Sequence, residues 1–543
     1  MVFQDKKKHV EKIILISLSF VFLFSQVGVV SAAPNTPTGP DRYTYAPEEY
    51  TTYQWWMLTW SDSEIVCDFT IESDDLPTYY DVYVNCGEGL ANAWLEQENC
   101  PADIYANHPG QCPGYYFQLV TTETALRDIA IPLPAPVVWI TLPDCTEIMG
   151  TSRCERPPVL VLQAEEPIAG EEIILVNGKV DGEEFSCQGS FCELPINETD
   201  ETGVEIDFWA ASSYGDTTEA FSAKVRVTYN ETEQGDIFWY VDVISTQWRG
   251  DANPSCAESW EAFPPEGGVP LWLSTPNSID ELESDLQYEY LAGTLIKAGV
   301  VDASQCIDFG VDEYGQATAC GLEAATEEMI DWQNRFDHLI MDAAEETQIP
   351  AVLLKRLFAR ESQFWPGVFN AGTDIGLGQL TIEGADFAFS WNPIFFEQFC
   401  PQVLDEDECD KGYFGISEDD QEYMRESLIY SVNATCDTCP LGVDLAQADF
   451  SVNLFANTLR ASCEQTGSVV YNNTGESPGD VASYEDLWRF ALVNYNAGAG
   501  CLGLAIEATQ DLGQDLIWSN LSQNLTEVCS GTKAYVEDIS TEE

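Results

Sequence analysis

The spacing of apolar residues changes near residue 278, and this change constrains the fold more than any other feature of the sequence. Before it, apolar and polar residues alternate over short runs such as "DIFWYVDVIS" (residues 236–245), which is typical of half-buried strands. After it, apolar residues recur about every 3.6 positions, which is typical of amphipathic helices. Strands followed by helices predict separate domains. We therefore expect a multidomain protein with a β-rich N-terminal half and an α-helical C-terminal half.

The β-rich half divides into two expected domains. Residues 50–154 hold short strand-like runs broken by Pro, Gly and Cys, which predicts a small Cys-rich β domain. Residues 155–250 hold longer strand-like runs between turn residues, which predicts an immunoglobulin-like β-sandwich. Within that sandwich, "NGK" (residues 177–179) is a signal for a hairpin turn.

The helical half follows a connecting segment. Residues 251–322 begin Pro- and Gly-rich and become helical, so we expect a linker and then a helix capped by Ser278, with Glu281 in the capping-box position. Residues 323–535 are expected to form the C-terminal domain. Its first helix is predicted over residues 323–347, because apolar residues line one face there.

Eighteen cysteines indicate disulfides and an oxidising compartment. They fall into even-numbered groups along the chain, which predicts bridges within each domain. The "CDTC" segment, residues 436–439, could be a redox or metal motif. The chain has three histidines, so a structural disulfide is the expected role. We expect no metal and no cofactor.

The N-terminus has the features of an export signal. Lysines precede an apolar run over residues 13–30, and small residues allow cleavage after Ala32. We expect a signal peptide over residues 1–32, with an uncleaved membrane anchor as the alternative, and a Pro-rich linker over residues 33–49. The protein is therefore expected to be secreted or extracytoplasmic, at the cell surface or cell wall. It would contact a membrane only if the anchor is retained.

The chain is strongly acidic, with 92 Asp and Glu against 22 Lys and Arg and a formal net charge of −70. Such a surface repels nucleic acid and anionic lipid. We therefore expect no nucleic-acid partner.

A carboxylate lies on the apolar face of the helix predicted after Pro350. Leu354, Leu357, Phe358 and Glu361 recur at positions i, i+3, i+4 and i+7, which places Glu361 on the buried stripe. Burial should raise its pKa, and a raised carboxyl pKa suits a general acid near neutral pH. From this helix alone, a salt-bridged or exposed glutamate at the helix end is the alternative.

Two later segments carry polar residues that could face this carboxylate. "GTDIGLGQLT" sets glycines around Gln379, whose amide could bind a sugar. "ALVNYNAGAG" ends a predicted helix with Tyr495 and Asn496, and Gly498 and Gly500 are expected to stop that helix. Taken singly, these segments could be an ordinary turn and an ordinary helix end.

In this order, the three segments resemble the catalytic domain of soluble lytic transglycosylases and goose-type lysozymes. The family pattern is a helix ending in Glu-Ser, then Gly-Leu-Met-Gln, then Tyr-Asn-Ala-Gly. Here "ES" is at 361–362, "GLGQ" at 376–379 and "YNAG" at 495–498. The resemblance covers roughly residues 325–510. It implies a lysozyme-like helical fold that cleaves the β-1,4 bond between N-acetylmuramic acid and N-acetylglucosamine in peptidoglycan glycan strands.

The family also implies roles for individual residues. Glu361 would protonate the glycosidic oxygen and then act as base, while the 6-hydroxyl of the muramic acid closes onto C1 to give a 1,6-anhydro product. Ser362, Gln379, Tyr495 and Asn496 would orient Glu361 or bind the sugars.

Two departures from the family pattern affect these expectations. The family's Met is Gly378 here, which is expected to widen the cleft, and residues 390–450 hold an insertion with four cysteines that could cover it. Asp374 or Asp386 could supply a second carboxylate for attack by water, which would give a hydrolase.

Other functions remain open on the sequence. They are a hydrolytic muramidase, a chitin-type glycosidase and a non-catalytic cell-wall-binding protein. The acidic surface gives no long-range attraction to anionic peptidoglycan, so binding would rest on hydrogen bonds and aromatic stacking. Trp55, Trp56 and Trp60 could form a sugar platform, but a core position is the expected one.

Overall fold

The computed structural model describes residues 42–232, 234–250 and 254–541. The predicted signal peptide lies outside these residues, as does the Pro-rich linker up to residue 41. The rest of that linker is part of a strand, β1 (Tyr43–Thr59). Within the described residues, no helix combines the length and the hydropathy needed to cross a membrane.

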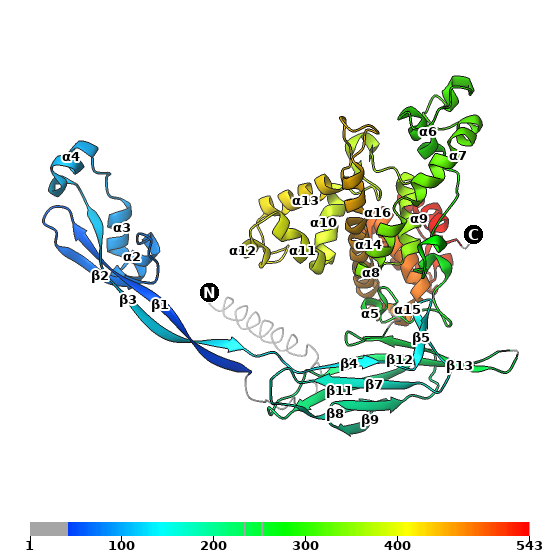
Figure 1. The fold of residues 1–543 in the computed structure, drawn as a ribbon, viewed down its shortest axis with the longest axis horizontal. Helices are drawn as coiled ribbons and strands as arrows, with labels where there is room; N and C mark the ends of the chain where they lie inside the picture. Colours follow the sequence, from blue (N-terminus) through cyan, green and yellow to red (C-terminus); the bar gives the residue numbers. More distant parts are fainter. Residues whose placement is uncertain (1–41, 233, 251–253, 542–543) are drawn as a thin grey trace, which may run out of the picture.

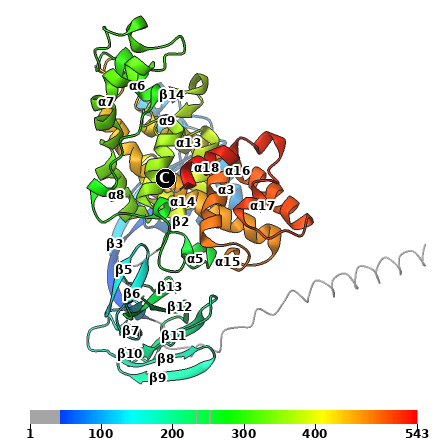
Figure 2. The same cartoon turned by 90° about the vertical axis from the view of Figure 1, so that its right-hand side faces the viewer.

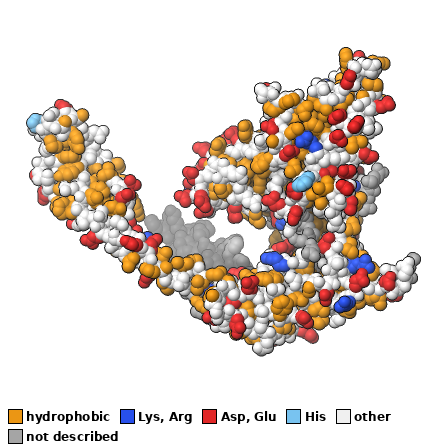
Figure 3. All heavy atoms as spheres, in the orientation of Figure 1, with side chains coloured by type: hydrophobic (Ala, Val, Ile, Leu, Met, Phe, Trp, Pro, Cys, Tyr) orange, Lys and Arg blue, Asp and Glu red, His pale blue; other side chains and the backbone are white. Residues whose placement is uncertain are grey.

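The predicted division into a β-rich N-terminal half and a helical C-terminal half is confirmed (Figure 1). Figure 1 shows three bodies in sequence order: an extended arm in blue, a β-sandwich, and a helical body that contains the C-terminus. Figure 3 shows Asp and Glu side chains scattered over all three bodies, with few Lys and Arg between them.

The arm is a three-stranded antiparallel sheet with helices at its tip. Its strand order is β2-β1-β3, where β2 is Ile65–Ile71 and β3 is Tyr115–Pro132. The short helices α2 (Tyr79–Cys86), α3 (Glu88–Leu95) and α4 (Ala102–Asn107) follow β2. Trp55 is buried in the small core of the tip, as expected, whereas Trp60 is half-buried and packs on Tyr116.

The sandwich consists of two antiparallel sheets that share one buried core, with strand orders β10-β7-β4 and β5-β6-β13-β12-β11-β8-β9. The strands are β4 (Val137–Thr141), β5 (Cys145–Ile148), β6 (Thr151–Cys154), β7 (Val159–Glu165), β8 (Ile173–Val180), β9 (Glu183–Gln188), β10 (Phe191–Pro195), β11 (Val204–Ser212), β12 (Phe221–Glu231) and β13 (Ile237–Ile244). Strands β4 to β6 precede residue 155, so the sandwich takes in residues that the sequence assigned to the domain before it. An immunoglobulin-like connectivity stays a prediction.

The hairpin turn predicted at residues 177–179 is wrong. These residues lie inside β8, and the turn to β9 is formed by Asp181 and Gly182, with φ of 49° and 81°. Both values suit a two-residue turn that matches the twist of the strands. Gly178 has a different reason to be glycine, because a Cβ there would overlap the backbone oxygen of Asp207 on β11.

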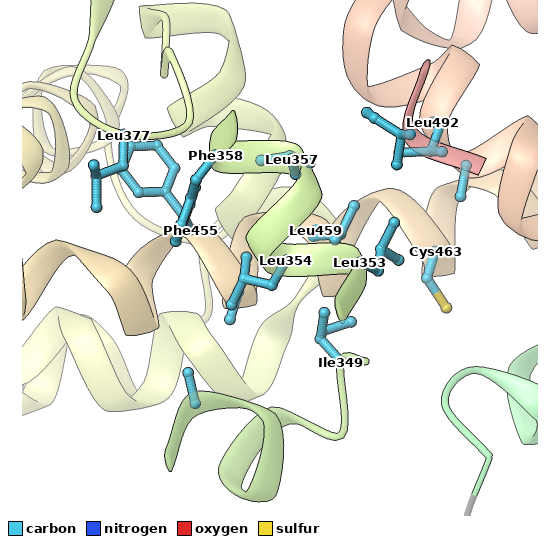
Figure 4. Packing of buried hydrophobic residues seen from close by; sticks show 14 of the residues in the cluster. Ile349, Leu353, Leu354, Leu357, Phe358, Leu377, Phe455, Leu459, Cys463 and Leu492 are labelled. Carbon is cyan, nitrogen blue, oxygen red and sulfur yellow. The ribbon is translucent and has the colours of Figure 1, made fainter. Parts of the chain in front are cut away.

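The helical body is built around α9 (Ala351–Ser362), α14 (Leu445–Thr474) and α16 (Tyr484–Asp511). Leu353, Leu354 and Phe358 of α9 pack beside Phe455 and Leu459 of α14 (Figure 4). The remaining helices are α5 (Ala257–Trp260), α6 (Glu289–Lys297), α7 (Ala319–Asn334), α8 (Asp337–Thr347), α10 (Ile382–Trp391), α11 (Pro393–Phe399), α12 (Glu406–Cys409), α13 (Glu418–Val432), α15 (Pro478–Val481), α17 (Trp518–Leu521) and α18 (Thr532–Ser540), with a short pair of strands, β14 (Val368–Phe369) and β15 (Asp374–Ile375).

Two helix predictions need correction. The helix predicted over residues 323–347 is divided into α7 and α8. Ser278 caps only a short 3-10 turn, and the helix after it, α6, begins eleven residues later at Glu289. The reason lies in α7: Asn334 accepts a hydrogen bond from the Ser284 N–H and Gln333 accepts one from the Leu286 N–H. These tertiary bonds replace those that a helix would make.

All eighteen cysteines form disulfides, which is typical of proteins that fold outside the cytoplasm. The pair in "CDTC" is bridged to itself, as predicted. The sequence grouped Cys256 with Cys306, and this group is wrong: Cys256 is bonded to Cys463 of α14, and Cys306 is bonded to Cys320. The bridges are Cys67–Cys86, Cys100–Cys112, Cys145–Cys154, Cys187–Cys192, Cys256–Cys463, Cys306–Cys320, Cys400–Cys409, Cys436–Cys439 and Cys501–Cys529.

Candidate active site

Glu361 lies in the last turn of α9. The helix begins directly after Pro350, and Leu354, Leu357 and Phe358 are fully buried on the face that the sequence predicted. Glu361 is half-buried at the end of the same face. The apolar stripe of α9 therefore fixes this carboxyl at the edge of the helical core.

The pKa of Glu361 is raised to about 7, mainly by burial, and the nearby charge of Asp374 acts in the same direction. A hydrogen bond from the Tyr535 hydroxyl to Oε1 (2.6 Å) and the charge of Arg360 act in the opposite direction. Since desolvation is the largest of these effects, a substantial fraction of the carboxyl is protonated near neutral pH. It can therefore donate a proton under conditions where an ordinary glutamate is ionised.

Tyr535 is a part of the site that the sequence analysis missed. It lies on α18, which packs against α9 and α16 (Figure 2). Arg360 of α9 holds this helix through an ion pair with Asp538 (2.9 Å) and lies over the Tyr535 ring. Burial and the charge of Glu361 raise the pKa of Tyr535 well above its usual range, so its hydroxyl stays a neutral donor. The helical spacing of Tyr535, Val536 and Ile539 on α18 indicates a buried tyrosine, but nothing in the sequence identifies its hydrogen-bond partner.

Replacing Tyr535 with phenylalanine should raise the pKa of Glu361. The tyrosine hydroxyl stabilises the carboxylate, so its loss favours the protonated form. We expect the alkaline limb of the pH–rate profile to move to higher pH, with a change of less than about tenfold in rate below pH 6. The profile is measured for the parent and for Tyr535→Phe. The control is Tyr484→Phe, because Tyr484 is also a buried tyrosine but donates its hydrogen bond to the Ser255 carbonyl. An unchanged profile would mean that Tyr535 does not tune Glu361.

The glycine-rich segment 376–379 is clamped beside the end of α9. The Ser362 hydroxyl donates to the carbonyl of Leu377 (2.8 Å), and the Tyr495 hydroxyl donates to the carbonyl of Gly378 (2.8 Å). Burial raises the pKa of Tyr495 well above its usual range, and the nearby charge of Glu361 acts in the same direction. Residues from three distant parts of the chain are thus brought together around one carboxyl.

Gln379 ends this segment in the left-handed region, with φ of 57°. Its side-chain amide donates to the Gly376 carbonyl (3.2 Å), and the side chain is half-buried. The amide oxygen remains available to accept a hydrogen bond from a ligand. Few non-glycine residues adopt this backbone conformation, and such conformations cluster at functional sites.

The site is not widened at Gly378. A Cβ at this position would overlap the Phe455 ring and would lie 2.9 Å from the Tyr495 hydroxyl. The Phe455 ring of α14 and the Tyr495 hydroxyl of α16 thus occupy the space that a side chain at position 378 would need.

Asn496 lies next to Tyr495, but it is exposed and contacts α18 rather than Glu361. Its Oδ1 accepts a hydrogen bond from the Thr532 hydroxyl (2.9 Å), at the start of that helix. The helical conformation breaks at Gly498 (φ 82°, ψ 162°), as the glycine signal predicted, and a second helical stretch follows it directly up to Asp511. The label α16 therefore covers two helices that meet at a kink.

The two candidates for a second carboxylate differ in position. Asp374, on β15, is close enough for its charge to act on Glu361, and it accepts a hydrogen bond from the Thr373 hydroxyl (2.7 Å). Asp386, on α10, is instead paired with Arg425 (2.9 Å) and accepts a hydrogen bond from Tyr413 (2.6 Å). Only Asp374 is assigned to the site on these grounds.

The insertion predicted over residues 390–450 includes α11, α12 and α13. It packs on α10 through an aromatic cluster that contains Phe389, Phe396 and Tyr413, and its helix α13 also contacts α14. Among the residues that the structure describes, no group of His, Cys, Asp or Glu is suited to hold a metal ion.

No family model matches this chain, and no curated protein matches it either. A solved structure of a polysaccharide lyase has 11% sequence identity, with coverage of 79% of this chain and 52% of the lyase chain. The chain thus spans about half the length of that protein. The TM-score of 0.14 is too low to indicate a shared fold.

Proposed function

We propose that this protein cleaves peptidoglycan glycan strands as a lytic transglycosylase, with Glu361 as general acid and base. One observation carries the proposal: a half-buried carboxyl with a pKa of about 7 lies beside the "GLGQ" segment and Tyr495. These are the segments that the family resemblance expects around a catalytic glutamate. A carboxyl that is partly protonated near neutral pH is what the first step requires.

In this reaction the protonated Glu361 transfers its proton to the glycosidic oxygen as the bond from that oxygen to C1 of the muramic acid breaks. The 6-hydroxyl of the same muramic acid then bonds to C1, and its proton passes to the Glu361 carboxylate. The enzyme is regenerated, and no water is consumed. Among the described residues Tyr535 occupies Oε1, so Oε2 is the oxygen that would exchange the proton.

The other site residues have positioning or binding roles in this proposal. Ser362 and Tyr495 hold the backbone of the glycine-rich segment, and Gln379 offers its amide to an N-acetyl group or hydroxyl of the sugar. Asn496 acts through α18, because its partner Thr532 begins the helix that carries Tyr535.

Hydrolysis is the second candidate, and the position of Asp374 favours it. The charge of Asp374 reaches Glu361, so this carboxylate could orient and deprotonate a water molecule that attacks C1. The product would then have a reducing end instead of an anhydro ring.

The products distinguish these reactions. Purified sacculi are digested with the parent protein, Glu361→Gln and Asp374→Asn, and the soluble fragments are analysed by mass spectrometry. We expect anhydro-muropeptides from the parent and from Asp374→Asn, and none from Glu361→Gln. Reducing-end fragments that disappear in Asp374→Asn would instead indicate a hydrolase. If the parent releases nothing, the protein is not a peptidoglycan-cleaving enzyme under the conditions used.

A further inference from the structure

A second candidate glycan site lies in the insertion, in a groove of about 520 Å³ beside α13. The groove is formed between α13 and the segment after α11, and it does not include Glu361. Residues that line it include Phe399, Gln402, Tyr423, Glu426, Ser427 and Tyr430. The lining therefore alternates aromatic rings with amide, carboxylate and hydroxyl groups.

Two tyrosines of this groove are unusually exposed for aromatic residues. Tyr423 is 55% exposed and Tyr430 is 79% exposed. They are seven residues apart on one face of α13, which is two turns or about 10 Å. Rings at this spacing offer two stacking faces, and the distance is on the scale of a disaccharide unit. Glu426 and Ser427 lie between them and can bind sugar hydroxyls.

The end of α13 packs against the glycine-rich segment of the candidate active site. Ser431, at the edge of the groove, is followed by Val432, the last residue of α13. A Cβ on Gly376 would lie 2.7 Å from the Val432 carbonyl oxygen. This buried contact fixes the helix that carries the two tyrosines relative to the segment that ends at Gln379.

The charge of the groove limits what can occupy it. Its lining contains the carboxylate of Glu426 and no Lys, Arg or His, in a chain of formal net charge −70. Nucleic acid and anionic lipid would be repelled, whereas an uncharged polyhydroxylated strand can stack on the tyrosines and bind the polar groups. We propose that the α13 groove binds the part of an N-acetylated glycan strand that extends beyond the cleaved bond. The identity of the strand rests on the proposed function.

The proposal is tested by binding in the inactive Glu361→Gln background. Uncharged N-acetylglucosamine oligomers of long and of tetrasaccharide length are titrated by calorimetry into this protein and into versions that also carry Tyr423→Ala and Tyr430→Ala. We expect the double variant to bind long strands at least about tenfold more weakly and tetrasaccharides unchanged. Tyr471→Ala is the matched control, because Tyr471 is 56% exposed on α14 and does not line the groove. Equal affinity of the double variant and the control for long strands would overturn the proposal.

Cleavage assays keep this proposal separate from the proposed function. With Glu361 intact, Tyr423→Ala with Tyr430→Ala should raise KM for long strands and leave turnover of short oligosaccharides unchanged. If the parent protein cleaves nothing and the double variant binds long strands more weakly, the proposed function is wrong and the groove proposal stands. If the parent cleaves long strands and the double variant cleaves them equally well, the groove proposal is wrong and the proposed function stands.

Discussion

Replacing Glu361 with glutamine should reduce glycan cleavage by about a thousandfold or more. Glutamine keeps the size of the side chain, and its oxygen can still accept the hydrogen bond from Tyr535. It has no acidic proton to give to the glycosidic oxygen. The rate is measured as the release of soluble fragments from sacculi over pH 5 to 9. A variant that retains more than a tenth of the parent rate would exclude Glu361 as the general acid.

The same substitution should stabilise the protein at high pH. The pKa of Glu361 is about 7 in the folded protein, against an ordinary value of 4.5 for a glutamate. The raised value means that its contribution to stability is present below about pH 4.5 and is lost as the pH rises through 7. Glutamine does not titrate, so the free energy of unfolding of the variant should increase relative to that of the parent as the pH rises from about 4.5 to 7. The shift corresponds to about 3 kcal/mol, and because Glu361 is only half-buried we expect about 2 kcal/mol.

Denaturant unfolding at pH 4.5 and pH 8.5 measures this effect. Glu507→Gln, at an exposed position on α16, is the control and should leave stability nearly unchanged at both pH values. A gain in stability at pH 8.5 that accompanies a loss of activity is the behaviour of a residue kept for function at a cost to folding. A loss of stability at pH 8.5 would instead mean that the carboxylate has a structural partner.

The local parts of the fold and of the site could be predicted from the sequence. The periodicity of α9 placed Glu361 on its buried face because side chains at i, i+3, i+4 and i+7 share one side of any helix. The rise in the pKa of Glu361 followed from that burial. Ser483 precedes an apolar-periodic run, the usual place for a capping residue, and it caps α16 by accepting a hydrogen bond from the Asp486 N–H.

Contacts between distant segments could not be predicted in the same way. Tyr535 donates to Glu361 across 174 residues, and α18 lies beyond the part of the chain that resembles a known family. Residues 284–288 carry helix-forming residues, yet Gln333 and Asn334 bind their backbone and keep them extended. The glycine signal at Gly498 predicted the break in α16, but not the second helical stretch that follows it.

The Cys256–Cys463 disulfide should contribute more to stability than any other bridge of the helical body. It closes a loop with a sequence separation of 207, against 9 for Cys400–Cys409. The chain-entropy relation gives about 5 kcal/mol for the long loop and about 3 kcal/mol for the short one. We therefore expect Cys256→Ser with Cys463→Ser to lower Tm by roughly 10 °C in calorimetry, and Cys400→Ser with Cys409→Ser to lower it less.

The segment after the sandwich is held to the helical body by more than this bridge. Residues 254–277 read as a linker, but Trp260 is fully buried and donates to the Cys463 carbonyl (3.0 Å), and the Tyr484 hydroxyl donates to the Ser255 carbonyl (2.5 Å). These contacts remain in the double variant, so the native structure should persist below its lowered Tm.

Figure 4 places Cys463 near Leu353, in the first turn of α9, whereas Glu361 lies in the last turn. Cleavage at low temperature should therefore be nearly unchanged, because the bridge limits the unfolded chain rather than shaping the site. An equal loss of Tm in the two double variants would mean that loop length is not the source of the stabilisation.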